Sequence, residues 1–304
     1  MKIISLIKRI SEELTSKKWN IGFTENNLDL FLTSKKPSIK YLKHNYKNKW
    51  FADPFILNVT EKEIVLLVEE YDKNIKRGRI AKLIINRNNL KLISMKIVLD
   101  LKSHLSFPAI YRDNNTVYVC PENSMSGRYF KYTYDFHSEE LVNPELIIDE
   151  PLTDAVKCYI NNIPYIFSTK QPNPHGNNLF IYSDEDQNKK YKLKQEIILS
   201  DNTARSAGHF IKLNGKIIRP AQDCNKSYGA GLVFQEIVKI KGKFRVTELK
   251  RIYSKSFKYG LGMHTYNTFG NIAVIDELGY KYIILGRIYN WLRVFVIYIY
   301  KFLK

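Results

Sequence analysis

The stretch Trp50-Phe-Ala-Asp-Pro-Phe55 places a carboxylate and a proline within a run of large aromatic residues. A carboxylate is costly to bury without hydrogen-bonding partners, and a proline removes a backbone donor from a strand. Polar and small residues interrupt the chain in a similar way at His104–Pro108, Thr153–Ala155, Arg205–His209 and Gly262–Thr265. The five clusters follow at intervals of about 50 residues, a period typical of one β-propeller blade. We therefore expect five blades.

The sequence between the clusters consists of short runs rich in β-branched and aromatic residues, such as Glu63–Glu69 and Thr116–Cys120. Turn residues separate these runs, for example at Asp113–Asn115 and Asn214-Gly215. This alternation predicts antiparallel hairpins in an all-β chain, with a five-bladed β-propeller over residues 19–288. The innermost strand of each blade lines the central channel of a propeller, so the clusters should converge on one axial pocket. The alternative is that they are ordinary polar loops.

The two ends of the chain differ from the middle. Residues 1–18 carry apolar side chains at helical spacing with Lys and Arg opposite, which predicts a short amphipathic N-terminal helix. We expect a last strand at residues 280–285, followed by a basic aromatic tail at residues 289–304. The tail is too short, and too interrupted by Arg293, to span a bilayer. Both ends fit an interfacial anchor on anionic lipid, or else a rim-packed helix and a closing strand.

The chain is strongly basic. Its 304 residues carry 48 Lys and Arg against 30 Asp and Glu, a formal net charge of +18. Such a field attracts nucleic acid, anionic lipid or phosphorylated small molecules. The lysines are scattered and no nucleic-acid-binding motif is recognisable, so no nucleic-acid partner is expected. No signal peptide is apparent, and we expect a cytoplasmic protein that is peripheral on the inner face of the cell membrane.

Acidic residues in or beside the clusters are the candidate catalytic groups. A carboxylate at such a position serves as a general base, a nucleophile or a clamp on sugar hydroxyls, and glycoside chemistry needs two carboxyl groups. For Asp53 the alternative is a carboxylate that caps a turn. The sequence offers four candidates, without the distances that would assign acid and base: Asp53, Glu122, Asp154 and Asp223.

Aromatic, basic and amide side chains near the clusters are the candidate substrate-binding groups. Arginine binds phosphate through two parallel hydrogen bonds, so Arg205 and Arg219 could hold the pyrophosphate of a nucleotide sugar without a metal. The histidines lack the short spacing of metal ligands, so neither a metal nor a cofactor is expected. The predicted substrate-binding set is Trp50, Glu70, His104, Ser106, Lys157, Arg205, His209, Arg219, Gln222, Tyr228 and His264.

Along most of the chain, from about Trp19 to His264, stand six short segments in a fixed order: Trp19–Phe23, Phe51–Phe55, Lys76–Ile80, His104–Pro108, Pro121-Glu122 and Arg219–Gly229. These segments resemble the propeller region at the N-terminus of plant glucosamine inositolphosphorylceramide transferases and its bacterial stand-alone relatives. The Ala-Asp-Pro element alone is similar to the first-blade motif of arabinanase-type five-bladed hydrolases, in which that Asp acts as base. The resemblance implies a five-bladed propeller and a carbohydrate context. It leaves the reaction open, because the plant proteins carry a separate transferase domain.

Three functions are compatible with these residues. The first, which we favour, is a glycosyltransferase of cell-surface polysaccharide or glycolipid biosynthesis, moving a sugar from a nucleotide-sugar donor to a glycan or lipid-linked acceptor. The basic charge, the amphipathic ends and the arginines support it. The second is a glycoside hydrolase, supported by Asp53 and the other acids. The third is a non-catalytic carbohydrate-binding module.

Overall fold

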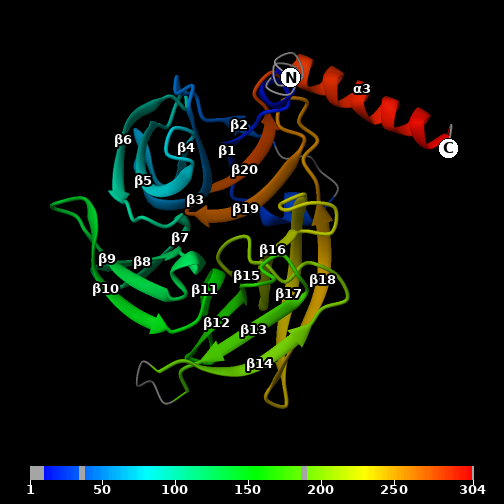
Figure 1. Cartoon of the computed structure of the whole chain (residues 1–304). Helices are drawn as coiled ribbons and strands as arrows, with labels where there is room; N and C mark the ends of the chain where they lie inside the picture. The colour runs from blue at the N-terminus through cyan, green and yellow to red at the C-terminus, as the bar shows by residue number, and fades with distance from the viewer. Residues whose placement is uncertain (1–9, 34–37, 186–189, 303–304) are drawn as a thin grey trace.

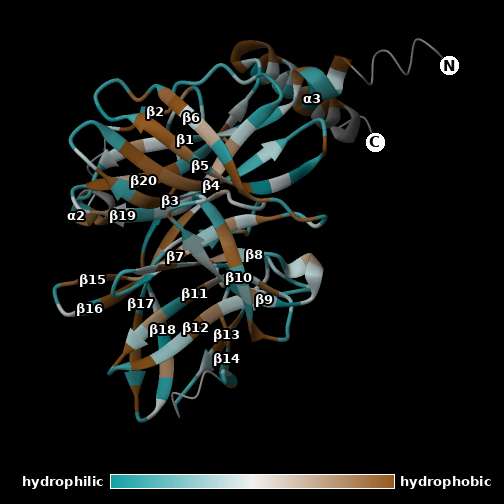
Figure 2. Cartoon of the chain, turned by 90° about the vertical axis from the view of Figure 1, so that its left-hand side faces the viewer, coloured by the Kyte–Doolittle hydropathy of each residue, from teal (hydrophilic) through white to brown (hydrophobic). Residues whose placement is uncertain are grey.

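The chain folds into a five-bladed β-propeller, as the sequence predicts (Figure 1). The computed structural model describes residues 10–33, 38–185 and 190–302. Each blade is a four-stranded antiparallel sheet, and the sheets are arranged around a common axis. The loops at the ends of the blades are largely hydrophilic, whereas the hydrophobic residues gather along the strands (Figure 2).

Four of the blades are continuous in sequence. The first consists of β3 (Lys49–Val59), β4 (Glu63–Asp72), β5 (Arg77–Asn86) and β6 (Leu92–Leu99). The second consists of β7 (Ser106–Asp113), β8 (Thr116–Glu122), β9 (Tyr129–Asp135) and β10 (Glu140–Ile148), with a short 3-10 helix η1 (Ser124–Ser126) after β8. The third consists of β11 (Leu152–Ile160), β12 (Ile163–Lys170), β13 (Asn178–Ser183) and β14 (Lys192–Ile198). The fourth consists of β15 (Ile211–Leu213), β16 (Lys216–Asp223), β17 (Gly231–Ile240) and β18 (Lys243–Ile252).

The fifth blade joins the two ends of the propeller. It combines β19 (Gly262–Phe269) and β20 (Ile272–Tyr280) with β1 (Lys17–Glu25) and β2 (Lys40–Tyr41), and α2 (Leu28–Leu32) lies between the last two strands. β1 pairs with β20 along its whole length, from Lys17 opposite Tyr280 to Glu25 opposite Ile272. Because an N-terminal strand completes the C-terminal blade, backbone hydrogen bonds close the ring.

The innermost strands of four blades share one irregularity, a β-bulge near the axis. In each bulge, one extra residue on the inner strand opposes the neighbouring strand, at Ala52–Phe55, Ser106–Ala109, Thr153–Val156 and Met263–Tyr266. Such a bulge bends the strand and re-aims a side chain. Asp53, Phe107 and Asp154 sit in these bulges with φ of 49°, 43° and 47°. Four of the five clusters that interrupt the sequence pattern are therefore bulges of inner strands, whereas the cluster Arg205–His209 lies just before β15.

Apolar side chains from neighbouring blades fill the space on either side of the bulges. Phe55 and Leu67 of the first blade pack with Phe107 of the second, and all three are fully buried. Burial of a side chain of this size stabilises the fold by about 1.5–3 kcal/mol. The bulges are thus set in a packed core, which fixes the direction of the polar groups at the axis.

Both ends of the described chain are helical. Residues 10–14 form a short helix, whereas residues 1–9 of the predicted amphipathic helix lie outside the described residues. The strand expected at residues 280–285 is wrong, because β20 ends at Tyr280 and α3 (Ile283–Phe302) follows. The start of α3 passes so close to β20 that a Cβ at Gly286 would lie 2.6 Å from Cγ of Tyr280. The helix then projects from the propeller (Figure 1). Within the described ranges, no helix combines the length and hydrophobicity needed to cross a membrane.

Candidate active site on the propeller axis

Asp53 lies where the first, second and fifth blades meet. Its Oδ1 accepts a hydrogen bond from Oγ1 of Thr265 at 2.7 Å, and its Oδ2 accepts one from the backbone N–H of Phe107 at 3.1 Å. Burial raises the pKa of the Asp53 carboxyl, although the neighbouring His264 opposes the shift. A raised pKa makes a carboxylate a stronger base, which favours proton abstraction from a hydroxyl group.

His264 connects Asp53 to a second carboxylate, Asp276 of β20. Its Nδ1 is 2.7 Å from Oδ1 of Asp276, and its Nε2 is 3.8 Å from Oδ1 of Asp53. Burial acts to lower the pKa of His264, but the two carboxylates raise it above the usual value. The imidazole stacks on the indole of Trp19, with ring centroids 3.9 Å apart, an arrangement that favours the charged form. His264 therefore lies between two carboxylates that favour its protonated form.

Asp53, His264 and Asp276 are close enough to be considered as metal ligands, since one ligand atom of each lies within 4.8 Å of the others. The oxygens of Asp276 are already in use. Its Oδ1 accepts hydrogen bonds from the backbone N–H groups of His264 at 3.1 Å and Thr265 at 2.9 Å, and its Oδ2 accepts one from Asp53 N–H at 2.8 Å. If Asp276 bound a metal ion, these buried backbone N–H groups would lose their acceptors, which costs about 1–3 kcal/mol for each group. The three residues fit a hydrogen-bonded network better than a metal site.

Asp154 and Arg205 form a buried ion pair between the third and fourth blades. Nε of Arg205 lies 2.6 Å from Oδ2 of Asp154, and Nη2 donates to Oδ1 at 3.2 Å. Nε2 of Gln222 donates to the same carboxylate at 2.8 Å. Burial raises the pKa of Asp154 to about 7, against the opposing effect of Arg205. Two-point pairing holds the guanidinium to this carboxylate, so it is not free to clamp a phosphate.

Two further acids face the same region, Glu122 at the end of β8 and Glu69 in β4. Glu122 accepts hydrogen bonds from Oγ of Ser106 at 3.1 Å and from the backbone N–H of Ser124 at 2.9 Å. Oε1 of Glu69 lies 3.3 Å from Nε2 of His104, but no described residue makes a hydrogen bond of good geometry to it. Burial first, and then nearby carboxylates, raise the pKa of Glu69 well above the usual value.

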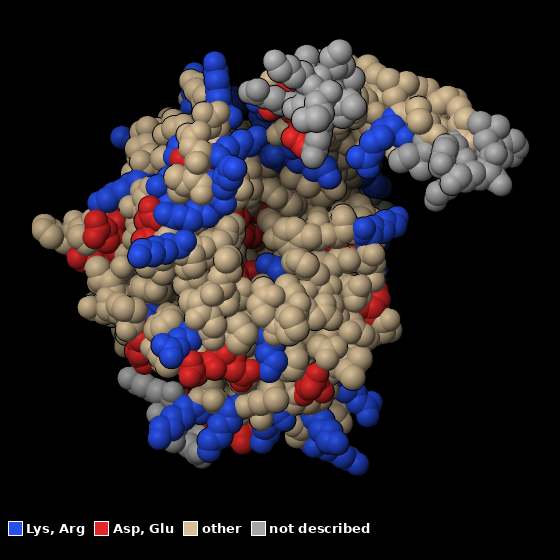
Figure 3. All heavy atoms as spheres, viewed as in Figure 1, with Lys and Arg blue, Asp and Glu red and all other residues tan. Residues whose placement is uncertain are grey.

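Tyr228 stands at the mouth of this region. It is 38% exposed, with its ring 5.0 Å from the guanidinium carbon of Arg205 and edge-on to His264 at 5.2 Å between centroids. Nη1 of Arg205 also lies 3.2 Å from Nδ1 of His175. A hollow with acidic and basic atoms inside is visible at the centre of the propeller (Figure 3). An aromatic ring beside convergent polar groups is a common arrangement in small-molecule sites.

We call this cluster the axial site: Asp53, Glu69, Glu122, Asp154, Arg205, Gln222, His264 and Asp276. Five of its side chains are carboxylic acids, against one arginine and one histidine. The hydroxyls of a neutral sugar can donate hydrogen bonds to these carboxylates. The axial site is therefore suited to an uncharged carbohydrate, on whose oxygens an acid and a base can act.

The structure brings together most of the predicted residues but leaves several outside the axial site. Arg219 is fully buried in the fourth blade, where it donates to the backbone oxygens of Thr203 and Ala204 and, at 2.6 Å, to Oε1 of Gln235. Burial lowers the pKa of Arg219 to about 9. Its donors satisfy buried acceptors within the blade and do not point to the axis.

Asp223, Trp50 and Glu70 also have partners within their own blades. Asp223 accepts hydrogen bonds from Nη1 of Arg251 at 3.2 Å and from the hydroxyl of Tyr253 at 2.6 Å. Trp50 stacks on Tyr71, with ring centroids 4.7 Å apart. Glu70 pairs with Lys49 at 2.5 Å and with Arg79 at 3.0 Å.

His209 and Lys157 face the other end of the channel. The His209 ring lies edge-on to Phe55 and to Tyr111, with centroids 5.1 Å and 5.2 Å apart. Burial lowers the pKa of His209 to about 4, so its ring is neutral near neutral pH. Lys157 lies three positions beyond Asp154, the bulge residue of β11, on the wall of a second cavity.

Sequence reasoning missed Glu69 as a site residue in favour of its neighbour Glu70, and it missed Asp276 and Thr265. The alternation of β4 cannot tell which of two adjacent acids faces the axis, but pairing does: Glu69 is opposite Ala52, the residue before Asp53. A signal for Asp276 exists, because it is the acid that directly follows the apolar run Ile272–Ile275 inside a strand. A charge in such a run needs a buried partner, here His264.

Fold and site together define a carbohydrate-related class of protein, the five-bladed β-propeller with a carboxylate-lined axial site. The family model described as "Glucosamine inositolphosphorylceramide transferase 1, N-terminal" matches residues 37–267, and the chain belongs to this family. Glucosamine inositolphosphorylceramide transferase 1 of Oryza sativa subsp. indica is 24% identical over 208 residues, which cover 64% of this chain. The protein of subsp. japonica gives the same values. The matched part is 27% of the length of these relatives.

Solved structures share the fold at low sequence identity. An exo-β-1,3-galactanase from Phanerochaete chrysosporium superposes with a TM-score of 0.53 at 9% identity, covering 69% of this chain and 53% of the galactanase chain. A β-xylosidase/α-arabinofuranosidase from a compost microbial metagenome superposes with a TM-score of 0.51 at 12% identity, covering 76% of this chain and 90% of the other. At such identities the likeness establishes the propeller fold alone.

Proposed function

We propose that the protein is a glycosyltransferase that adds a sugar to a glycan or lipid-linked acceptor of a cell-surface polysaccharide or glycolipid. The acceptor sugar binds in the axial site, and the donor is a nucleotide sugar. The observation that carries this proposal is the Asp53 carboxylate, which is buried, raised in pKa and held by Thr265 and Phe107 at the axis. Membership in a family named for a glycolipid transferase favours transfer over other reactions.

In the proposed reaction Asp53 is the general base. An acceptor hydroxyl gives its proton to Asp53, its oxygen forms a bond to the anomeric carbon of the donor, and the nucleoside diphosphate leaves with the bonding electron pair. The imidazolium of His264 stabilises the charged form of Asp53 before the step and is itself held by Asp276. Arg205, fixed by Asp154, contributes a permanent positive charge beside the reacting sugar.

A second candidate function is glycoside hydrolysis. The specific observation in its favour is the excess of carboxyl groups in the axial site, because hydrolysis requires one carboxylic acid and one carboxylate across the glycosidic bond. Glu69 and Asp154 have raised pKa values, as a proton donor at neutral pH requires. In this alternative, water takes the place of the acceptor hydroxyl at Asp53.

The deciding experiment supplies purified protein with a panel of nucleotide sugars and lipid-linked acceptors, and separately with neutral oligosaccharides. Release of nucleoside diphosphate together with an enlarged acceptor supports transfer. Cleavage of an oligosaccharide without any donor consumption contradicts transfer and favours the hydrolase. Binding of sugar without either reaction contradicts both enzymatic functions and supports a non-catalytic carbohydrate-binding module.

We also propose that the protein binds an anionic membrane surface through α3. The helix exposes large apolar side chains around its circumference, including Ile284 at 64%, Trp291 at 63% and Val296 at 63% exposure. Beside its base is a group of lysines that repel one another: burial first, and then Lys258, Lys73 and Lys281, lower the pKa of Lys18. Lys281 of this group pairs with Glu13, and the others add positive charge beside the helix. Exposed apolar surface next to a group of lysines suits a helix that lies in the headgroup region of anionic lipid.

Vesicle flotation tests the membrane surface. Replacing Trp291 and Val296 by Glu should abolish binding to phosphatidylglycerol vesicles, because two charges enter the apolar face. Replacing the equally exposed Ile198 at the end of β14, which is 72% exposed, should leave binding unchanged. Equal binding of all three proteins would refute the role of α3.

A further inference from the structure

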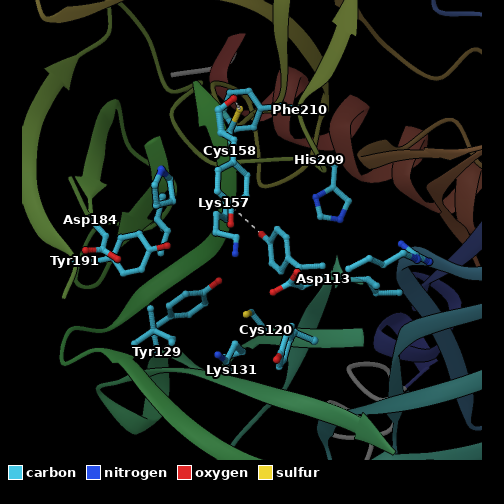
Figure 4. Close-up of a pocket in the computed structure, with 18 of the residues that line it drawn as sticks. Asp113, Cys120, Tyr129, Lys131, Lys157, Cys158, Asp184, Tyr191, His209 and Phe210 are labelled. Atoms are coloured by element: carbon cyan, nitrogen blue, oxygen red, sulfur yellow. Dashed lines mark hydrogen bonds between the residues drawn. The ribbon is translucent and has the colours of Figure 1, made fainter. Parts of the chain in front are cut away.

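A second cavity lies between the second and third blades, away from the axial site (Figure 4). Its volume is about 810 Å³, within the usual range for small-molecule pockets. The cavity is lined by the C-terminal halves of β7 and β11, whereas the axial site is at their N-terminal ends. Ser106 and Tyr111, on β7, mark the two ends and are roughly 17 Å apart along the strand. The two sites are therefore separate.

Two lysines of this cavity have no carboxylate partner. The ammonium group of Lys157 lies 5.2 Å from the ring centroid of Tyr111 and 5.1 Å from that of Tyr159, and it points into the open space (Figure 4). Lys212 of β15 lines another wall. In the part of the chain that the structure describes, no acidic oxygen lies within 4 Å of either ammonium group. A cation without a counter-ion in a concave site attracts an anion.

The acids of the cavity are placed where they do not neutralise these two lysines. Glu145 is paired with Lys131 at 2.7 Å. Burial first, and then Tyr159 and Asp184, raise the pKa of Tyr191, so Asp184 lies near that tyrosine, and Asp113 is exposed at the end of β7. The positive charge of Lys157 and Lys212 is thus not compensated at short range.

Arg112 also lines the cavity, and its guanidinium donates to the backbone oxygens of Ile56 and Leu57. The thiol and phenol groups of the wall are uncharged near neutral pH. Burial raises the pKa of the Cys120 and Cys158 thiols to about 11 and that of the Tyr129 hydroxyl well above its usual value. Aromatic rings make up much of the wall, with Tyr129 and Tyr191 on one side in Figure 4. Flat rings beside free ammonium groups match a ligand that has both a ring and an anionic group.

We propose that this cavity binds a phosphate-bearing small molecule whose ring stacks on the tyrosines and whose phosphate pairs with Lys157 and Lys212. A nucleotide and a sugar phosphate share this chemistry, and stacking of a planar base favours the nucleotide. The proposal does not depend on the reaction at the axial site.

Calorimetric titration of the full chain with uridine monophosphate, glucose 1-phosphate and inorganic phosphate tests the proposal. The nucleotide should bind, and the double substitution Lys157→Gln and Lys212→Gln should weaken it at least tenfold, since each lost charge-assisted contact accounts for about that factor. Lys157→Arg should retain binding. The matched control, Lys216→Gln with Lys243→Gln on exposed positions of the fourth blade, should bind as the parent protein does.

The outcomes separate the ligand sources. Tighter binding of uridine monophosphate than of glucose 1-phosphate supports a nucleotide site, and the reverse order supports a sugar-phosphate site. No binding of any probe at millimolar concentration, or equal binding by the double variant, overturns the proposal. Asp53→Asn should leave nucleotide binding unchanged, so a failure of the axial reaction and a failure of this cavity give different results.

Discussion

The axial site and the cavity between the second and third blades lie at opposite ends of the same inner strands, yet their chemistry is opposite. At the axial end, carboxylates outnumber cations and nearly every charge has a partner, as in the pair of Asp154 and Arg205. At the cavity end, the Lys157 ammonium lies beside the rings of Tyr111 and Tyr159 and has no carboxylate partner among the described residues. The difference teaches that a bulge at one end of a strand creates a pre-formed polar network, whereas the regular end leaves groups free for a ligand.

The largest effect should come from breaking the axial ion pair. Arg205→Met leaves the buried Asp154 carboxylate without its cationic partner, which should lower the free energy of unfolding by about 3–5 kcal/mol. Lys131→Met in the cavity is the matched control, because its partner Glu145 is 42% exposed and the pair should contribute under about 1 kcal/mol. Urea unfolding measures both. Similar losses of unfolding free energy in the two variants would contradict the claim that the axial site is pre-organised and the cavity is solvated.

A smaller change of opposite sign should follow Glu69→Gln. The folded-state pKa of Glu69 is raised, so its favourable contribution exists below its unfolded pKa and is lost as pH rises through the folded value. Near pH 8 the buried carboxylate therefore destabilises the fold, and Glu69→Gln should raise the free energy of unfolding by about 1–2 kcal/mol. The gain should vanish near pH 4. A variant less stable than the parent at both pH values would show that Glu69 has a hydrogen-bonding role.

The pH dependence of stability should differ between the two ends of the channel. The pKa of His264 is raised, so its contribution is present below its unfolded pKa and lost as pH rises through the folded value. The pKa of His209 is lowered to about 4, so its contribution is present above its unfolded pKa and lost as pH falls towards 4. Thermal unfolding at a series of pH values measures this difference. His264→Gln should flatten the dependence of Tm on pH on the alkaline side, and His209→Gln should flatten it on the acid side. If both variants flattened the profile on the same side of the pH range, the opposite pKa shifts of His264 and His209 would be contradicted.

The fold was largely predictable because short segments of sequence mark each blade at a regular spacing. Polar clusters recur once per blade, and in four of the five blades the structure shows them as bulges, including those at Asp53 and Asp154. The strand expected at residues 280–285 failed because apolar, aromatic sequence suits either an exposed helix or a strand, and periodicity over six residues does not separate them. Gly286 allows the start of α3 to pass close to the ring of Tyr280, a contact that the local sequence pattern does not reveal.

Part of the axial site could be predicted from the same clusters, since Asp53, Asp154, Arg205 and His264 all occur in them. Side-chain partners could not be predicted. Arg219 is in a predicted site segment, but its donors are directed to carbonyl groups of its own blade. Which face of a strand an arginine occupies depends on register, and register is a long-range property.

The most direct test of the central claim is the turnover of Asp53→Asn in the donor and oligosaccharide assays, with Asp113→Asn in the cavity as the matched control. Removing the general base should reduce the rate of glycosidic bond formation or cleavage by at least about 100-fold, while the control remains at the parent rate. Asparagine keeps one oxygen to accept the hydrogen bond from Thr265 but loses the acceptor for the N–H of Phe107, so urea unfolding of the variant must show that it is folded. Full turnover by Asp53→Asn, with correctly folded protein, would contradict the axial site as the seat of the reaction.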